Sequence, residues 1–357
     1  MSTVMHYGTL FPTGVVGSLP RSAFVRDLIA GEDDGYREAS LDAAVAYAVG
    51  LQEAAGLNIV TDGEWRRTSY IGVIAELAHG FELGSNPADG RPWTIVVDKL
   101  SPKSSGFIAK EISFLRSITD KQIKATLPAP ALLGERMWDP DKSSRAYPTR
   151  EAFIRDCVPI LRAEAERLAE AGADIVQIDD PHLCLFVDPE VRAKVEDADR
   201  AADFATDTVN QVIDGISGVK LAVHLCRRAG ARARGEVRHA GGYAPILGQL
   251  NRLAVHHLTL EFTAPGSGDL ATLGRLREDL EIGLGCVSVT PGEIDSPETI
   301  AARVREVLAF VPPERITLNP DCGFAPGSGA QVSLDEAYNK LCNEVSAAVL
   351  LREEHTG

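Results

Sequence analysis

The sequence has little positive charge. It carries 36 Lys and Arg residues against 51 Asp and Glu residues, which gives a formal net charge of −15 at pH 7. Nonspecific binding to nucleic acid and binding to anionic membrane surfaces both depend on basic surfaces, so this composition argues against both classes of protein. A small anionic substrate held by a local group of arginines remains compatible with the charge.

Long apolar runs and closely spaced cysteines are also lacking. No apolar run reaches the roughly 20 residues that span a bilayer, and residues 1–14 lack the charged and then apolar layout of a signal peptide. We therefore expect a cytoplasmic protein with no membrane partner. Scattered cysteines in a chain of 357 residues predict reduced thiols, and a thiol at a strand end is then a candidate metal ligand or nucleophile. The six cysteines are Cys157, Cys184, Cys226, Cys286, Cys322 and Cys342.

Apolar, β-branched segments alternate with segments of helical period along almost the whole chain. Apolar strands of this kind are typical of parallel sheets that are buried on both faces, and eight such units close a (β/α)₈ barrel. A doubly wound sheet is the competing architecture, but no G-x-G-x-x-G motif follows the first strand. We predict a single α/β domain over residues 1–357, a (β/α)₈ TIM barrel. The expected strands are residues 14–19, 57–63, 123–128, 174–180, 220–226, 257–262, 282–289 and 315–322.

Helical periods fill most of the connections between these strands. Several of the expected helices end in Ala-Gly just before the next strand, as at Gly56 and Gly172, and glycine is favoured directly after a helix. Residues 80–118 show no clear helix and include the strand-like WTIVVDKL (93–100). We predict that this segment is an insertion, a hairpin or lid, between the second and third strands. The expected helices include residues 41–56, 149–172, 199–216, 296–310 and 333–353.

Polar side chains stand at the C-terminal ends of several expected strands, where the active sites of barrel enzymes lie. His224 and Cys226 end the fifth strand and, as residues i and i+2, would project to the same side, about 6–7 Å apart along the backbone. Glu261 ends the sixth strand, and Cys322 follows the eighth. An imidazole, two thiols and a carboxylate match the ligands that Zn²⁺ takes in tetrahedral geometry. The pattern therefore predicts a metal site at this rim.

Each of these residues also has a purely structural interpretation. A buried histidine followed by a small apolar cysteine accounts for the HLC segment alone, and Cys322 could be a buried apolar side chain. Glu261 could form a salt bridge with Arg227 or Arg228, since a buried carboxylate must be paired. At the ends of other strands, Asp179 or Asp180 could cap the following helix.

Six segments, in this order along the chain, resemble the catalytic barrel of the cobalamin-independent methionine synthase family. The resemblance runs from about residue 14 to residue 325 and is strongest to short, single-barrel members without the family's N-terminal half-domain. The short members are also similar at HAGGYAPI (239–246) and FTAPGSGD (262–269). The six segments are VGSLPR (16–21), TDGEWRR (61–67), VQIDDP (176–181), HLC (224–226), LEF (260–262) and NPDCGF (319–324).

The resemblance implies a zinc-dependent S-methyltransferase of methionine biosynthesis. In the family, a zinc-bound thiolate such as that of homocysteine accepts the methyl group on N5 of a reduced folate such as 5-methyltetrahydrofolate. A free thiol has a pKa of about 8.5, so metal binding is what makes the thiolate available near neutral pH. The resemblance implies zinc ligands at His224, Cys226, Glu261 and Cys322. It also implies that Ser18, Glu64 and Asp179 hold the amino acid, with Asp180 beside them.

The chain departs from the family pattern at two places. Full-length members carry a proton-donating histidine after strand seven, where Thr290 stands here, so Thr290 is a candidate catalytic residue beside Glu64 and Asp179. An acidic and aromatic stretch after the second strand is replaced by TSYIGV (68–73). These two departures leave open whether the methyl or alkyl donor is a folate.

A second thiol alkyltransferase remains possible on these residues. The epoxyalkane:coenzyme M transferases resemble the same short barrels and open an epoxide with a zinc-bound thiolate. Arg66, Arg67 and Arg227 near the rim would suit a sulfonate, carboxylate or phosphate, although solvated charge explains them equally well.

Two further classes of protein compete with a thiol transferase. One is a metal-free lyase of the uroporphyrinogen decarboxylase type, which would need none of the predicted zinc ligands. The other is a non-catalytic zinc protein, although structural zinc sites favour closely spaced ligands from local loops. The expected partners are a small-molecule thiol and a methyl or alkyl donor, and the sequence leaves open whether the chain forms a homodimer.

Overall fold

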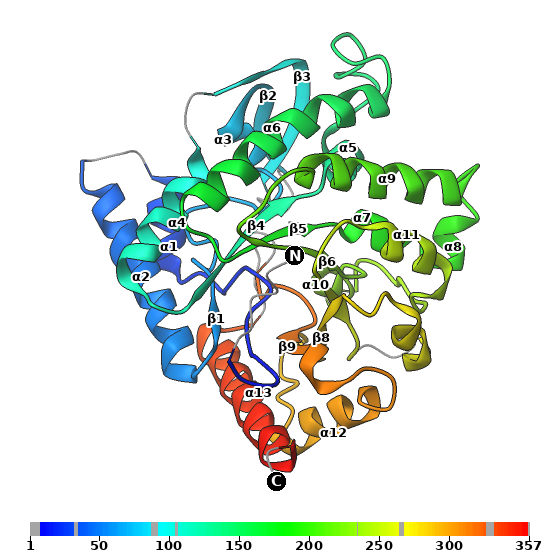
Figure 1. Ribbon diagram of the computed structural model, residues 1–357. Helices are drawn as coiled ribbons and strands as arrows, with labels where there is room; N and C mark the ends of the chain where they lie inside the picture. The colour runs from blue at the N-terminus through cyan, green and yellow to red at the C-terminus, as the bar shows by residue number, and fades with distance from the viewer. Residues whose placement is uncertain are drawn as a thin grey trace.

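The computed structural model describes residues 8–31, 35–86, 92–103, 106–233, 235–263, 268–325 and 332–355. Over these residues, seven parallel strands form a curled sheet in the order β1-β4-β5-β6-β7-β8-β9 (Figure 1). The strands are β1 (Ile59–Val60), β4 (Gln122–Pro128), β5 (Ile175–Asp179), β6 (Lys220–Leu225), β7 (His257–Glu261), β8 (Glu281–Val287) and β9 (Ile316–Pro320).

An eighth segment closes the sheet between β9 and β1. Thr13 forms a parallel bridge to Leu318 of β9, and Gly14 forms one to Ile59 of β1. The amide of Gly14 donates to the carbonyl of Leu318 at 3.2 Å, and the amide of Ile59 donates to the carbonyl of Thr13 at 3.0 Å. The chain therefore folds as a (β/α)₈ barrel, which confirms the predicted fold class. Regular pairing in the first strand is limited to these two bridges, so that strand is much shorter than expected.

Helices surround the barrel on its outer side (Figure 1). Their buried faces pack on strands whose residues are buried almost throughout, as in β5, β6, β7, β8 and β9. The longer helices are α1 (Ala23–Ala30), α2 (Arg37–Ala55), α4 (Phe107–Ile118), α5 (Pro130–Met137), α6 (Arg150–Glu170), α9 (Ala198–Ile213), α12 (Pro297–Val307) and α13 (Leu334–His355). The shorter ones are α3 (Ile74–Leu77), α7 (Pro181–Leu185), α8 (Pro189–Arg192), α10 (Ala229–Ala233), η1 (Ala244–Ile246), α11 (Leu247–Arg252), η2 (Leu270–Arg275) and η3 (Pro313–Arg315).

Local sequence signals set the ends of the helices. Thr149 accepts a hydrogen bond from the amide of Ala152 at the start of α6, a cap that typically stabilises a helix by about 1 kcal/mol. Gly56 directly follows α2 with φ of +91°, and Gly172 lies two residues after α6 with φ of +95°. Glycine adopts this left-handed conformation without a side-chain clash. The Ala-Gly endings therefore mark helix ends, as predicted from the sequence.

The expected insertion divides into two parts. A hairpin, β2 (Ala78–Ser85) and β3 (Pro92–Pro102), lies at one edge of the barrel beside α6 (Figure 1). The prediction of no helix in residues 80–118 was wrong for residues 107–118, which form α4 and pack on α6 and β4. Ile108, Ile112 and Leu115 are the buried face of α4, and this period of three to four residues was obscured by the β-branched residues within it.

The described part of the chain contains no helix that is both long and apolar enough to cross a membrane.

Candidate active site

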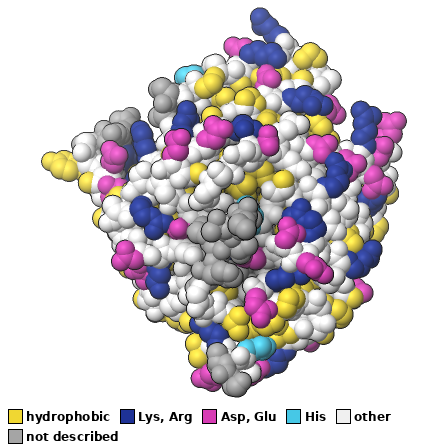
Figure 2. Space-filling view, viewed as in Figure 1, with side chains coloured by type: hydrophobic (Ala, Val, Ile, Leu, Met, Phe, Trp, Pro, Cys, Tyr) yellow, Lys and Arg dark blue, Asp and Glu magenta, His cyan; other side chains and the backbone are white. Residues whose placement is uncertain are grey.

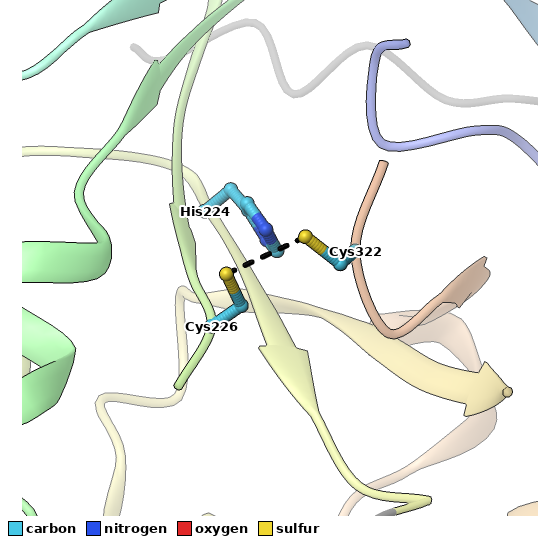
Figure 3. A group of neighbouring side chains, drawn as sticks. All are labelled: His224, Cys226 and Cys322. Atoms are coloured by element: carbon cyan, nitrogen blue, oxygen red, sulfur yellow. Dashed lines mark hydrogen bonds between the residues drawn. The ribbon is translucent and has the colours of Figure 1, made fainter. Parts of the chain in front are cut away.

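The strongest side-chain cluster stands at the C-terminal rim of the barrel. His224 lies on β6, Cys226 directly follows that strand, and Cys322 follows β9. Figure 3 shows the three side chains pointing toward one another from these two elements. One potential ligand atom from each residue lies within 4.8 Å of the others, and all three residues are buried. The distant strands therefore bring together the histidine and both cysteines of the predicted metal site.

The imidazole of this cluster lacks protein hydrogen-bond partners. Both ring nitrogens of His224 are buried and make no hydrogen bond, although a buried polar atom without a partner is costly. The Cys322 thiol donates to the Cys226 sulfur at 3.5 Å. That hydrogen bond lowers the pKa of the Cys226 thiol and raises the pKa of the Cys322 thiol. The unpaired imidazole of His224 and the two adjacent sulfurs of Cys226 and Cys322 are suitable ligands for a zinc ion.

Glu261, the fourth predicted ligand, is placed differently. Its carboxylate accepts from the Arg227 amide at 2.8 Å and from the Arg227 guanidinium at 3.2 Å. Arg232 also pairs with both carboxylate oxygens. Glu261 is fully buried and lies outside the compact cluster, so arginines are its counter-charge in this structure. The salt-bridge interpretation holds for Arg227, while its other partner is Arg232 rather than Arg228.

A cavity of about 260 Å³ opens onto the cluster of His224, Cys226 and Cys322. His224, Cys226 and Cys322 line it together with Ser18, Glu64 and Asp179, the three residues expected to hold an amino acid. The parallel register explains part of this arrangement, because Asp179 on β5 is paired directly with His224 on β6.

Ser18 is fixed at the rim by the chain that follows β9. Its Oγ accepts from the Ala325 amide at 3.1 Å, and Gly323 lies so close that a β-carbon there would be 2.3 Å from the same oxygen. The serine hydroxyl therefore uses its lone pair on the protein backbone, while its own proton remains available to an acceptor in the cavity.

Glu64 is held by a buried polar network. Its Oε1 accepts from the Thr126 hydroxyl at 2.9 Å and lies 3.9 Å from the Arg67 guanidinium, which also binds Glu111 at 2.9 Å. Its amide donates to Asp62 at 3.0 Å, and its φ of +56° is unusual for a residue other than glycine. Because its Oε2 makes no hydrogen bond, Glu64 presents one oxygen that can accept from a ligand.

Asp179 is a second buried carboxylate in the cavity. The Gln177 amide donates to its Oδ1 at 2.8 Å and also donates to the carbonyl of Val16 at 3.0 Å. Burial raises the pKa of Asp179 to about 7 and also raises the pKa of Glu64. A cation bound between these carboxylates would favour their ionised forms, so the cavity is suited to a ligand with an ammonium group.

Five other predicted site residues lie outside this cavity's lining. Asp180 caps α7 by accepting from the Leu183 amide at 2.9 Å, which is the capping alternative. Arg227 is engaged with Glu261, and Thr290 packs near α13, where its carbonyl accepts from Lys340 at 2.6 Å. Arg66 and Arg67 pair with Asp42 and Glu111. Asp180 and the three arginines have protein partners, and none of these five residues lines the cavity beside His224, Cys226 and Cys322.

Tyr70 and Arg136 line the cavity although the sequence assigned them no role there, and they are joined by Arg228. Tyr70 comes from the TSYIGV segment, and burial, with Cys226 next in effect, raises the pKa of its hydroxyl well above the usual value. Arg136 comes from the last turn of α5, and Arg228 pairs with Glu135 at 2.7 Å. Arg228 has φ of +56°, so both Glu64 and Arg228 show uncommon backbone conformations at the cavity. Such conformations leave no signal in a single sequence.

The molecular face in Figure 2 has a mixed charge pattern. Acidic and basic side chains are interspersed among the coloured residues, and hydrophobic side chains are visible near the centre of the face.

Sequence comparisons find related proteins over almost the whole chain. A family model for the "Cobalamin-independent synthase, Catalytic domain" matches residues 11–349. A methionine synthase of Saccharolobus islandicus is 29% identical over 358 residues, covering 97% of this chain and 96% of that protein. The methionine synthase of Sulfolobus acidocaldarius is 27% identical over 360 residues, covering 97% of this chain and 94% of that protein.

Solved structures share the fold at low sequence identity. A B12-independent methionine synthase from Shewanella sp. W3-18-1, in complex with selenomethionine, has a TM-score of 0.79 at 23% identity and covers 98% of this chain and 99% of that chain. A methyltransferase from Methanosarcina mazei has a TM-score of 0.63 at 17% identity, covering 98% of this chain and 95% of that chain.

Proposed function

The chain belongs to the family of cobalamin-independent synthase catalytic domains, and from this premise we propose that it is a zinc-dependent thiol S-methyltransferase. The thiol acceptor is an amino acid such as homocysteine, and the methyl donor is a reduced folate such as 5-methyltetrahydrofolate. The observation that carries the proposal is the buried set of His224, Cys226 and Cys322 in the same cavity as Ser18, Glu64 and Asp179.

The proposed metal site rests on the unpaired ring nitrogens of His224 and on the two sulfurs that converge with them. His224, Cys226 and Cys322 would hold the ion, because a histidine nitrogen and two thiolate sulfurs are preferred zinc ligands. Zn²⁺ bound there would act as a Lewis acid that lowers the pKa of a substrate thiol and favours its thiolate near neutral pH. Because Arg227 and Arg232 neutralise Glu261, an ion held by His224, Cys226 and Cys322 would be free to take the substrate sulfur as a further ligand. Glu261 as a fourth ligand stays a prediction.

The remaining residues orient the amino acid. The free Oε2 of Glu64 and the carboxylate of Asp179 would accept hydrogen bonds from its ammonium group. The Ser18 hydroxyl would donate to its carboxylate. These contacts fix the amino acid at one end, so that its sulfur reaches the metal cluster and faces the open side of the cavity. Positioning of this kind turns an encounter between two substrates into a reaction within one complex.

Methyl transfer then consists of one displacement. A lone pair on the substrate sulfur forms the new S–C bond while the bond from the methyl carbon to the donor nitrogen breaks. The thiol has lost one proton and the departing nitrogen gains one, so the overall reaction is balanced. Tyr70 lines the cavity as a neutral hydroxyl, whereas Thr290 does not line it.

Zinc analysis tests the proposal directly. We expect one zinc per chain by elemental analysis, and a zinc-edge X-ray absorption spectrum that gains a sulfur neighbour when homocysteine is added. Methionine should form when 5-methyltetrahydrofolate is supplied. Zinc that is unaffected by homocysteine would redirect the proposal to another thiol or to a structural metal. No zinc in protein purified with added metal would overturn it and favour the metal-free lyase.

A further inference from the structure

A cavity of about 300 Å³ lies outside the barrel, between α6, α3 and the end of β3 (the outer cavity). Figure 1 shows α3 and β3 beside α6, and both elements contact that helix. The outer cavity shares no lining residue with the cavity beside His224, Cys226 and Cys322 (the metal cavity). A ligand in the outer cavity would therefore touch neither the metal ligands nor the residues proposed to hold the amino acid.

The middle of the outer cavity has apolar walls. Pro159, Ile160 and Ala163 lie on one face of α6, at the spacing of three to four residues that brings side chains together on a helix. Pro159 carries a ring where other residues have an amide hydrogen, so it adds apolar surface and no donor. Leu77 of α3 and Leu100 of β3 are apolar walls from the other two elements. These walls favour a ligand with an apolar body.

Charged side chains stand at the two ends of this face of α6. Asp156 and Arg167 both line the outer cavity and are eleven positions apart on the helix, about 16 Å at 1.5 Å per residue. The Asp156 carboxylate lies 3.7 Å from the Lys99 ammonium, so the charges at that end are balanced. The other end is different, because it carries two cations.

Lys103 and Arg167 form this cationic end. Gly106, three residues after Lys103, lies so close to Arg167 that a β-carbon there would be 2.9 Å from the Arg167 Cδ. The Lys103 ammonium donates to the carbonyl of Ala75 and forms no ion pair with any residue in the described part of the chain. An ammonium group has three N–H donors, so Lys103 can donate to a ligand as well.

Glu164 offsets only one of these two cations. It lies 3.4 Å from the Arg167 guanidinium, and its other carboxylate oxygen accepts from the amides of Ile108 and Ala109 at 2.9 and 3.0 Å. Its single negative charge is therefore shared between Arg167 and the start of α4. The cationic end keeps an excess of one positive charge beside an apolar surface.

We propose that the outer cavity binds a small amphipathic monoanion, an apolar chain or ring that ends in one carboxylate. The carboxylate would accept from Lys103 and Arg167, and the apolar body would lie along Ile160 and Ala163 toward the Asp156 end. The single excess charge favours one anionic group, and the apolar walls favour such a ligand over an inorganic anion. The inference is independent of the proposed function, because the two cavities share no residue.

Isothermal titration calorimetry of the zinc-loaded protein with octanoate tests the inference. Hexanoate should bind about tenfold more weakly than octanoate, since each buried methylene contributes about three- to fourfold in affinity. Lys103→Gln should weaken octanoate binding by about tenfold or more, because one charge-assisted hydrogen bond is lost. Ala163→Leu should also weaken it, because the longer side chain fills part of the cavity. The matched control is Lys110→Gln, since Lys110 is exposed on α4 and lines neither cavity.

Cys322→Ser separates the outer cavity from the metal, which can also bind a carboxylate. This variant should bind octanoate as tightly as the unmodified protein does, and Lys103→Gln should keep its zinc content and its rate of methionine formation. Loss of octanoate binding in Cys322→Ser would place the ligand at the metal and overturn the inference. Equal octanoate affinity in Lys103→Gln, Ala163→Leu and the unmodified protein would overturn it as well. The same holds if octanoate does not bind, or if octyltrimethylammonium binds as tightly as octanoate.

Discussion

The two sides of the metal cavity satisfy their polar groups in opposite ways. On the β6 and β9 side, both nitrogens of His224 are buried without a hydrogen bond, and the Cys322 thiol donates to the Cys226 sulfur. On the β1 and β4 side, Glu64 is enclosed by Thr126, Arg67 and the neighbouring Glu111. The first side lacks partners that an ion would supply, whereas the second side already pairs its carboxylates with the buried Arg67 before any ligand binds.

This difference distinguishes groups that bind from groups that position. An unpaired buried donor or acceptor costs roughly 1–3 kcal/mol, so His224 is retained at a cost unless a ligand compensates it. The network around Glu64 leaves three buried carboxylate oxygens without a hydrogen bond: Oε2 of Glu64, Oε1 of Glu111 and Oδ2 of Asp62. We therefore expect changes on the first side to remove the metal, and changes on the second side to alter stability and substrate affinity while the metal remains.

Cys322→Ser should have the largest effect, because it removes one of three converging metal ligands. We expect loss of most zinc and of more than about 100-fold in the rate of methyl transfer, since changes to groups behind metal ligands already cost about 10- to 100-fold. Elemental analysis and a methionine assay measure the two effects. Circular dichroism should show an intact barrel, because the change lies at the rim.

Cys342→Ser is the matched control for this change. Cys342 lies on α13, is only partly buried and belongs to no metal-ligating cluster among the described residues. Zinc content and rate should stay close to those of the unmodified protein. Equal loss of zinc in both variants, or unfolding of Cys322→Ser, would contradict the division between a metal-binding and a positioning side.

Arg67→Met breaks the other side. Arg67 is almost completely buried and pairs with Glu111 at 2.9 Å, so the change leaves two carboxylates buried without their cation. Removing one partner of a buried ion pair typically lowers the free energy of unfolding by about 3–5 kcal/mol. Urea unfolding should show this loss, and the KM for homocysteine should rise because Glu64 loses its support.

Lys220→Met provides the comparison at the opposite rim. Lys220 pairs with Glu281 at 2.7 Å, and both lie at the first residues of their strands, far from the strand ends that carry the site. We expect a loss of stability without a change in the KM for homocysteine. A similar rise in KM in both variants would mean that general destabilisation, rather than the position of Glu64, sets the affinity.

The convergence of His224, Cys226 and Cys322 could be predicted from the sequence, since it follows from where the strands end. His224, Cys226 and Cys322 stand at the ends of apolar strands, and a parallel barrel brings all C-terminal ends to one rim. The same logic placed Ser18, Glu64 and Asp179 in the cavity. Local pattern and barrel geometry together were sufficient for these residues.

The partners of buried charges could not be predicted in this way. Glu261 pairs with Arg232, which approaches it through the short helix α10 after β6, and nothing in the spacing of the two residues indicates that contact. Glu111 reaches Arg67 from α4, a helix that the sequence pattern did not reveal. Arg136 enters the lining of the cavity beside His224 only because α5 ends beside the β2–β3 hairpin. The paths of the segments that connect the strands determine these contacts, and a single sequence does not show those paths.

Asp179→Asn tests the energetic cost of the second carboxylate. Burial raises the pKa of Asp179 from 3.8 to about 7, so the folded state binds a proton more tightly than the unfolded state. The stability of the unmodified protein should therefore fall as pH rises from about 4 to 7, by about 4 kcal/mol in total. Asparagine cannot ionise, so the variant should be the more stable protein at pH 8 and should lose this advantage toward pH 4.

Urea unfolding of the metal-free proteins between pH 4 and pH 8 measures this difference. Homocysteine binding should weaken in Asp179→Asn while zinc content stays unchanged, because Asp179 lines the cavity but is not part of the metal cluster. A stability difference that does not depend on pH would show that Asp179 is already ionised in the folded protein. Loss of zinc would place Asp179 closer to the metal than the present geometry does.

Thr126→Val makes the smallest change to the positioning side, since it removes one hydroxyl at nearly constant volume. That hydroxyl donates to Glu64 at 2.9 Å and accepts from Arg67 at 3.0 Å. We expect the KM for homocysteine to rise by about tenfold, the equivalent of one hydrogen bond, with zinc content unchanged. Thr206→Val is the matched control, because Thr206 is equally buried on α9 and bonds only its own helix. If both variants lose stability but only Thr126→Val loses affinity for homocysteine, the Thr126 hydroxyl holds the Glu64 carboxylate in place for a ligand.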